Sequence, residues 1–579
     1  MQRTIRHAAC VLTMVAACLS AAAQTSADVT PKPEAAPSTQ QPLAQQIAAL
    51  LADPAVARAH WGVMVTALDG KPIYALNEGQ LFRPDSNAKL FTTAAAMALL
   101  GADHRFTTQV VASGNLDKQG VLHGDLMLVG GGDANFGADT LPYVAPSLRP
   151  QNPPPALSNI ADIDQLADQV VAAGLHEVQG NVIGDDHIFS WEGYPGSWET
   201  GDLLWGYGAP VSALAIHNNE IDVTVAPNPE SHPTRSLPAE IQTTPNVPYY
   251  TIENHVYTMA MGSGGCDARL LFRRDPGSKT LEVSGDIPPG AAPCTERIAI
   301  EDPAQIAALA LKSALERRGV HVTGTTNAKH WDPERLPGNP GVDVNRMPDT
   351  PQDRERVDAY LQARFSDSTP NSESKYVCTY FIAGPTPPKE IALATHTSPP
   401  LQEDIVYTNK VSQNLHAELF VRDLGSEYTC GTDVPGSLNV VRQWLMYLGI
   451  DKDDFVFYDG SGLSSHDLVT PRAVAKLLSY AAHDPKTGQP QPWFTPWKAS
   501  LPVGGVDGTL ADRFTTAPLK GHVFAKTGTH SEGRALSGYL DCASGQTVIF
   551  SILDENHLPG DTADRDAMDR IVAAIAAAE

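Results

Sequence analysis

The sequence predicts an α/β protein whose core is split by a long, strand-rich insertion. Three observations predict this fold. An alternating apolar hairpin pattern and an alanine-rich helical run stand near the start, at residues 61–77 and 86–100. Short strand-like runs fill residues 106–324, and the chain closes on three strand patterns and a helix between residues 522 and 577. With 579 residues, of which 42% are hydrophobic, the chain is long enough for several packed cores.

The first residues predict export. Arg3 and Arg6 precede an apolar stretch of small residues that ends in three alanines, so residues 1–23 are interpreted as a signal peptide. The alternative is a lipobox ending at Cys18, whose lipidation would hold the protein to a membrane. The soluble form is favoured, and membrane contact is expected only in the lipidated case. The predicted location is periplasmic or secreted.

Charge and cysteine content exclude two classes of function. A formal net charge of −25 argues against nucleic-acid binding, which needs a basic surface. Without the signal peptide, five cysteines remain, and in an oxidising compartment some are expected to pair; Cys266 with Cys294 is the first choice because both lie in one loop-rich region. No Cys-x-x-Cys and no close histidine cluster is present, so no structural zinc is predicted.

Further along the chain, turn residues and the spacing of apolar residues predict the helices, strands and loops. Residues 24–42 are rich in Pro, Ser, Thr and Ala and predict a tether, and Asp69-Gly70 predicts the hairpin turn. Within the insertion, residues 162–174 and 302–319 show helical periods. Residues 328–388 lack a sustained period and predict a surface excursion with one short helix around residues 357–364. Helical periods return over residues 403–425 and 438–449.

Four short motifs that could carry chemistry follow in order. They are Ser86-x-x-Lys89, Ser412-Gln413-Asn414, "DGSGLSS" at 459–465, and Lys526-Thr527-Gly528-Thr529. Each is weak alone, because second copies of three of them occur at Ser372-x-x-Lys375, Ser437-Leu438-Asn439 and Lys486-Thr487-Gly488. The structural alternatives are a helix cap at Ser86, a polar turn at 412–414 and a solvated strand-end charge at Lys526.

Sequence context separates the two sets of copies. Ser86 opens an apolar helical run, which places Lys89 one turn on and on the same face, whereas Ser372 has no such run behind it. Lys526 follows an apolar strand pattern, whereas Lys486 lies in a proline-bounded turn. Ser412 lies two residues before Asn414 in a helical pattern, so their side chains converge only at a helix start or bend.

In this order the motifs resemble the penicillin-binding D-alanyl-D-alanine carboxypeptidases/endopeptidases of the peptidase S13 family, the class C low-molecular-mass penicillin-binding proteins. Other resembling stretches are "LVGGGDANF", "GNVIGDDHIF", "YGAPVSALAIHNN", "DGSGLSSHDLVTP" and "LPVGGVDGTL". The resemblance implies a serine β-lactamase/transpeptidase-like α/β sandwich whose insertion forms two smaller domains. The implied parts are a catalytic domain at 43–105 and 389–579, an inserted domain at 106–192 and 299–327, a nested domain at 193–298, and an extra excursion at 328–388.

The resemblance also implies the catalytic roles. Ser86 would attack the carbonyl between two D-alanines after a neutral Lys89 removes its proton, and the backbone N–H groups of Ser86 and Thr529 would stabilise the oxyanion. Ser412 would relay a proton to the leaving D-alanine, and Asn414 would hold the substrate amide.

Substrate binding would fall to the last motif. Lys526, with Thr527 and Thr529, would bind the terminal carboxylate, and Gly528 would keep the strand edge open for the peptide. Asp185 and His530 are the further substrate-binding residues that the resemblance implies. The expected ligands are peptidoglycan stem peptides ending in D-Ala-D-Ala and β-lactam antibiotics, and the scheme needs no metal or organic cofactor.

The sequence departs from the family pattern at two positions, and two other functions stay open. Gln413 stands where the family commonly has Asp or Asn, and Ser465 stands where members that bind a diaminopimelate side chain often have Arg. One alternative is a serine β-lactamase or esterase on the same fold. The other is a cell-wall-binding scaffold with a decayed site, against which the intact motifs argue.

Overall fold

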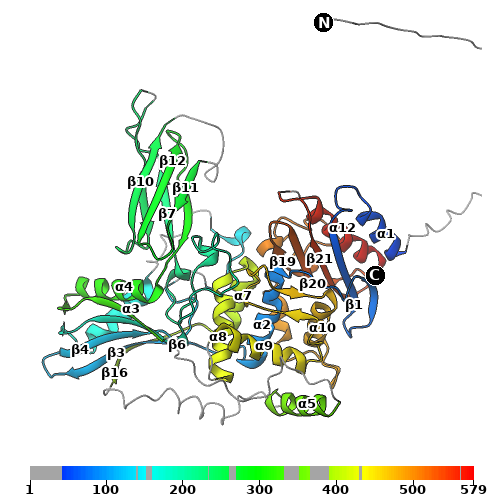
Figure 1. Ribbon diagram of the computed structural model, residues 1–579, viewed down its shortest axis with the longest axis horizontal. Helices are drawn as coiled ribbons and strands as arrows, with labels where there is room; N and C mark the ends of the chain where they lie inside the picture. The colour runs from blue at the N-terminus through cyan, green and yellow to red at the C-terminus, as the bar shows by residue number, and fades with distance from the viewer. Residues whose placement is uncertain are drawn as a thin grey trace, which may run out of the picture. The chain divides into compact units, whose positions relative to one another are not determined.

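The computed structural model describes residues 42–137, 141–150, 160–232, 234–259, 269–331, 351–365, 390–429, 433–560 and 562–579 (Figure 1). The predicted signal peptide, the lipobox and the tether up to residue 41 lie outside these ranges. Among the helices of the described ranges, none combines the length and the apolar character that a membrane crossing requires.

The two ends of the chain build one antiparallel sheet of five strands, in the order β19-β20-β21-β1-β2. Their bounds are β1 His60–Ala67, β2 Pro72–Leu76, β19 Val523–Thr529, β20 Gly533–Asp541 and β21 Thr547–Glu555. The predicted hairpin is confirmed, with Gly70 at φ +82° in its turn, where a residue without Cβ is favoured. The three predicted closing strands are confirmed as well.

Helices cover both faces of this sheet, because successive side chains of a strand point to opposite faces. On β21, Phe550 and Ile552 pack with α1 (Leu43–Leu51) and α12 (Ala563–Ala578). Ile549 and Leu553 pack on the other side, in the core that holds α2 (Ala88–Leu99) and α10 (Pro471–Ala482). The result is the predicted α/β sandwich (Figure 1).

The second core is built around α2, in which every residue except Ala98 is buried. Its neighbours are α7 (Leu401–Val411), α8 (Asn414–Tyr428), α9 (Val434–Tyr447), α10 and α11 (Phe494–Ser500). The short strands β17 (Phe455–Val456) and β18 (Leu468–Val469) pair on either side of the 459–465 loop. The helix that follows Ser86 is therefore anchored on all sides.

The insertion contains three further sheets. The first holds β3 Thr107–Leu116, β4 Val121–Val129, β5 Glu177–Val178, β6 Val182–Ser190, β14 His321–Val322, β15 Thr326–Trp331 and β16 Glu390–Thr397, with α3 (Ala161–Ala172) and α4 (Pro303–Arg317) packed on it. The others hold β7 Glu220–Ala226, β9 Glu240–Thr244 and β13 Cys294–Ala299, and β8 Leu237–Pro238, β10 Thr251–Thr258, β11 Leu270–Arg273 and β12 Thr280–Ile287. One hydrophobic cluster runs through all three sheets, so the predicted division at 193–298 stays a prediction.

One predicted boundary is wrong. Residues 390–397 were assigned to the catalytic domain, but they form β16, which pairs antiparallel with β3 at the edge of the inserted sheet. The pairing joins residues almost 300 positions apart, and no local pattern indicates such a partner. Ala394, for example, is buried in the core of the insertion.

The prediction that residues 328–388 form a surface excursion is wrong for two segments. Residues 328–331 complete β15 in the inserted sheet. The predicted short helix is present but longer, as α5 (Pro351–Phe365), and it packs against α9. Its residues Val357, Leu361 and Phe365 are buried in the core around α2. Three apolar residues at helical spacing are enough to bury one face of an otherwise polar helix.

The described cysteines are Cys294 and Cys542. Cys294 is disulfide-bonded, and Cys542 is free and buried. The partner of Cys294 therefore lies outside the described residues, as does Cys266, and the pairing of these two stays a prediction.

Candidate active site

The turn that carries Ser86 is held by two glycines of distant motifs. Ser86 is partly exposed in a 3-10 turn, Asp85–Asn87, that leads into α2. A Cβ added at Gly462 would lie 1.7 Å from the backbone oxygen of Asp85, and one at Gly528 would lie 2.8 Å from the Asp85 Cβ. Only glycine allows the 459–465 loop and strand β19 to approach the turn this closely.

Lys89 lies one helical turn after Ser86 and is fully buried. Its Nζ donates to Ser86 Oγ at 3.0 Å, to Asn414 Oδ1 at 2.6 Å and to the Ser461 carbonyl at 2.7 Å. Burial lowers the pKa of Lys89 to about 8, although the carboxylates of Asp459 and Glu418 oppose the shift. With this pKa, roughly a tenth of Lys89 is neutral at pH 7, far more than for an ordinary lysine.

The 459–465 loop contacts Lys89 through the backbone carbonyl of Ser461. Glu418 on α8 accepts the N–H groups of Gly460 at 3.0 Å and Ser461 at 2.7 Å. Asp459 accepts from the Gly462 and Ser464 N–H groups. These bonds fix the Ser461 carbonyl that Lys89 contacts.

A break between two helices brings Ser412 and Asn414 together, as their spacing requires. Helix α7 ends at Val411, Ser412 has a left-handed backbone at φ 62° and ψ 41°, and α8 begins at Asn414. Gln413 Oε1 accepts the Leu415 N–H at 3.1 Å and caps α8. The middle residue of this motif therefore has a structural role.

Lys526 is the second buried lysine of the site. From β19 its Nζ donates to Ser412 Oγ at 2.9 Å and to the Thr527 carbonyl at 2.9 Å. No carboxylate of the described ranges forms an ion pair with it. Burial and the nearby charge of Lys89 hold the pKa of Lys526 well below its usual value. A buried amine of this kind favours an anionic ligand.

The remaining predicted residues of the last motif lie at the end of the same strand. Thr527 Oγ1 is 2.7 Å from Thr509 Oγ1, and Thr529 is exposed. His530 follows directly, with Nδ1 3.2 Å from an Arg83 guanidinium nitrogen and 3.3 Å from Glu532. His530 is therefore near the turn of Ser86, and its role in substrate binding stays a prediction.

The inserted chain also contributes to the site, which the sequence analysis missed. The Tyr207 carbonyl accepts from Asn414 Nδ2 at 2.9 Å, and the exposed Tyr207 hydroxyl donates to Asp202 at 3.0 Å. Trp198 Nε1 donates to Asp459 at 2.9 Å. In the sequence, this contribution is marked only by the stretch "YGAPVSALAIHNN", which supports the resemblance to the family but suggests no chemistry for Tyr207.

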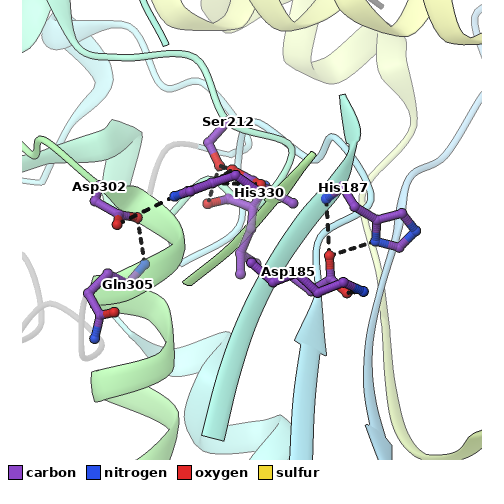
Figure 2. Close-up of polar contacts among 9 residues, drawn as sticks. Asp185, His187, Ser212, Asp302, Gln305 and His330 are labelled. Atoms are coloured by element: carbon purple, nitrogen blue, oxygen red, sulfur yellow. Dashed lines mark hydrogen bonds and ion pairs between the residues drawn. The ribbon is translucent and has the colours of Figure 1, made fainter. Parts of the chain in front are cut away.

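Asp185 is not brought to the site. It is fully buried on β6, where one carboxylate oxygen pairs with His187 Nδ1 at 2.6 Å and the other with Lys329 Nζ at 2.7 Å (Figure 2). Both oxygens already have partners within the inserted sheet. The expected contact with substrate is not supported by this arrangement.

The neighbouring residue Asp186 belongs to a network that superficially resembles a Ser-His-Asp triad. Asp186 pairs with His330 Nδ1 at 3.0 Å, and His330 Nε2 lies 3.5 Å from Asp302 (Figure 2). Burial alone would lower the pKa of His330, but the bonds to Asp186 and Asp302 raise it to about 9. Ser212 donates to Asp186 at 2.8 Å and not to His330 among the described contacts, so this histidine is an ion-paired link rather than a base.

The second copies of the motifs lie elsewhere. Lys486 is exposed, and Ser437 is fully buried within α9. Ser372 and Lys375 lie outside the described residues. These positions agree with the choice made from sequence context, and the assignment of the catalytic copies stays a prediction.

One buried group in the described ranges has ligand atoms close enough to hold a metal ion, namely Asp554, His557 and Asp564. Arg534 forms an ion pair with Asp564, and His557 Nδ1 is 3.1 Å from Asp554. Both carboxylates therefore already have partners, and we assign no metal to them. The expectation of no metal stays a prediction.

Comparison with known proteins decides the family. The model of the D-Ala-D-Ala carboxypeptidase 3 (S13) family matches residues 43–333 and 377–578. The chain belongs to this S13 family. The match confirms the resemblance seen in the motifs, and the enzyme class is serine-type carboxypeptidase. The unmatched segment, 334–376, contains α5, which is thus an addition of this chain to the S13 pattern.

Individual S13 relatives agree. The chain is 32% identical over 534 residues to the D-alanyl-D-alanine carboxypeptidase of Actinomadura sp. strain R39, covering 91% of this chain and 83% of that protein. It is 24% identical to the penicillin-sensitive carboxypeptidase A of Dictyostelium discoideum, covering 88% and 86%. The crystal structure of penicillin binding protein 4 from Haemophilus influenzae superposes with a TM-score of 0.67 at 20% identity, covering 91% of this chain and 98% of that one. This likeness confirms the transpeptidase-like fold.

Proposed function

We propose that this S13 enzyme removes the terminal D-alanine from peptidoglycan stem peptides through an acyl-enzyme on Ser86, and that penicillin acylates the same serine. The observation that carries the proposal is the convergence of two hydrogen-bonded groups, Ser86 and Asn414 on Lys89 and Ser412 on Lys526, which meet at the break between α7 and α8. The relative from Actinomadura is named for D-Ala-D-Ala hydrolysis, and a Haemophilus homologue was crystallised with a β-lactam.

The first half of the reaction would use Ser86 and Lys89. Neutral Lys89, 3.0 Å from Ser86 Oγ, takes the hydroxyl proton as the oxygen attacks the substrate carbonyl. The N–H groups of Ser86 and Thr529 then hold the oxyanion. Asn414, which also contacts Lys89, would receive the substrate amide.

The second half would use Ser412 and Lys526. Ser412 Oγ lies 2.9 Å from Lys526 Nζ and passes the proton to the leaving amine. Lys526 binds the terminal carboxylate, which supplies the anionic partner that this lysine lacks among the described residues. Water then hydrolyses the acyl-enzyme. Such an enzyme is exported to the periplasm or the medium, where its substrate is found.

Labelled penicillin and mass spectrometry test the proposal. The expected result is one persistent label on the peptide containing Ser86, and release of D-alanine from a stem pentapeptide. Ser86→Ala should abolish both without unfolding, and Ser372→Ala, in the second copy of the motif, should not. Rapid turnover of the label would indicate a β-lactamase, and no label with no D-alanine release would indicate a scaffold.

A further inference from the structure

The residue before the nucleophile is a buried acid for which the scheme above has no task. Asp85 is 4% exposed, and its Oδ2 is buried without a hydrogen-bond partner among the described residues. Its backbone is left-handed at φ 46°, which is uncommon outside glycine, asparagine and aspartate. An unpartnered buried carboxyl is costly, so its place beside Ser86 needs an explanation.

Asp85 lies between the turn of Ser86 and the strands β19 and β20. Its Cβ would be 2.8 Å from a Cβ built at Gly528, and its Oδ2 would be 3.9 Å from one built at Gly533. The two N–H groups proposed for the oxyanion belong to its neighbours, Ser86 in the chain and Thr529 directly after Gly528. A charge on Asp85 would therefore stand beside the position where the oxyanion forms.

The charged groups that face Asp85 leave it without a full counter-ion. Arg83, Arg534 on β20 and Lys89 on α2 favour its ionised form, and Glu555 and Asp554 at the end of β21 oppose it. Arg83 already bonds Glu555, through its N–H at 2.6 Å, and Arg534 pairs with Asp564. Burial outweighs the cations and raises the pKa of Asp85 to about 8.

We propose that Asp85 is a positioning residue that acts as a neutral carboxylic acid, packing the turn of Ser86 against β19 and β20, and that its ionisation slows acyl transfer. The inference rests on the proposed acyl-enzyme at Ser86. A carboxylate next to the oxyanion site repels the charge that develops in the transition state. In partly buried surroundings, this repulsion should slow acylation by roughly tenfold or more.

The decisive variant is Asp85→Asn, which is neutral at every pH, nearly equal in shape and tolerant of a left-handed backbone. The rate constant for acylation of Ser86 by labelled penicillin is measured from pH 6 to 9.5 in the wild type and in this variant. The control is Asp423→Asn, because Asp423 is also buried with a raised pKa but lies nine residues after Asn414 along α8. Because deprotonation of Lys89 raises the rate of all three proteins alike, the rates are compared as ratios: relative to Asp85→Asn, wild type and control should fall by about tenfold between pH 6 and 9.5.

A second variant tests the inference even if Asp85→Asn does not fold. Glu555→Gln removes a negative neighbour of Asp85, so the midpoint of the alkaline fall should move to lower pH. The inference is overturned if the rate of the wild type does not fall relative to that of Asp85→Asn, or if Glu555→Gln leaves the midpoint of that relative fall in place. Absence of acylation in the wild type at every pH would instead refute the proposed function, and this inference with it.

Discussion

Leu361 offers a test of whether α5, the helix that this chain adds to the S13 pattern, belongs to the folded core. Leu361 is 3% exposed and lies in the same hydrophobic cluster as Trp444 of α9. Leu361→Ala removes three carbons, and about 0.8 kcal/mol for each buried carbon gives roughly 2.4 kcal/mol. The cavity left behind raises the expected loss of unfolding free energy to about 3 kcal/mol.

Neighbouring contacts support this magnitude. The Phe365 ring lies 5.8 Å from that of Tyr447 and 6.2 Å from that of Tyr428, and Arg364 donates to the Tyr428 carbonyl at 2.7 Å. A helix of 15 residues is marginal on its own, so its packing holds it in place. Loosening one buried contact should therefore loosen the attachment of the whole helix.

Urea unfolding, followed by tryptophan fluorescence and by hydrogen exchange of α5 and α9, measures the effect. The matched control is Asp358→Ala, on the exposed side of the same helix, which should change unfolding free energy by less than about 0.5 kcal/mol. Acylation of Ser86 should stay within about twofold in the folded protein, since α5 contacts α9 and none of the motif residues in the described contacts. Equal stability of Leu361→Ala and its control would refute the packing argument and restore the surface excursion.

Three shorter predictions concern the site. Gly462→Ala should abolish acylation, because the new Cβ would collide with the Asp85 carbonyl and because φ is +77° there; a labelled variant would show that the loop can retreat. Between pH 6 and 8 the acylation rate should rise as Lys89, whose pKa is lowered to about 8, loses its proton; a flat profile over that range would remove Lys89 as the base. Lys486→Ala should leave D-alanine release unchanged, since this lysine is exposed and outside the site; a large loss would mean that the motif copies were assigned wrongly.

Features encoded by local sequence were predictable. The hairpin at Gly70, the helices α3 and α4 and the closing strands each have a clear period or a turn residue. The motif residues were preferred over their second copies because of their order along the chain and the helix or strand pattern around each motif. Lys89 follows Ser86 by one helical turn, so that pair needed no tertiary information.

What the sequence did not predict depends on contacts between distant segments. The helical period runs on through residues 403–425, and only the left-handed Ser412 shows where α7 ends and α8 begins. Tyr207 joins the site through a backbone carbonyl, which no side-chain motif encodes. The buried face of α5 is made by three apolar residues in a polar helix, and too few apolar positions remain to signal packing.

The two lysines of the site show why the substrate carboxylate would matter for the chemistry as well as for binding. In the free protein, Lys526 has the more strongly lowered pKa, because no carboxylate of the described residues offsets its burial, whereas Asp459 and Glu418 favour charge on Lys89. The proposed acyl transfer needs the reverse order of pKa values, in which Lys89 is neutral and Lys526 is charged. A carboxylate bound at Lys526 stabilises the charge there, and two unpaired positive charges so close together are unfavourable. The proton is then better placed on Lys526, and Lys89 is left free to act as the base. In the proposed mechanism, binding energy from the terminal carboxylate would thus set the charge state in which Ser86 reacts.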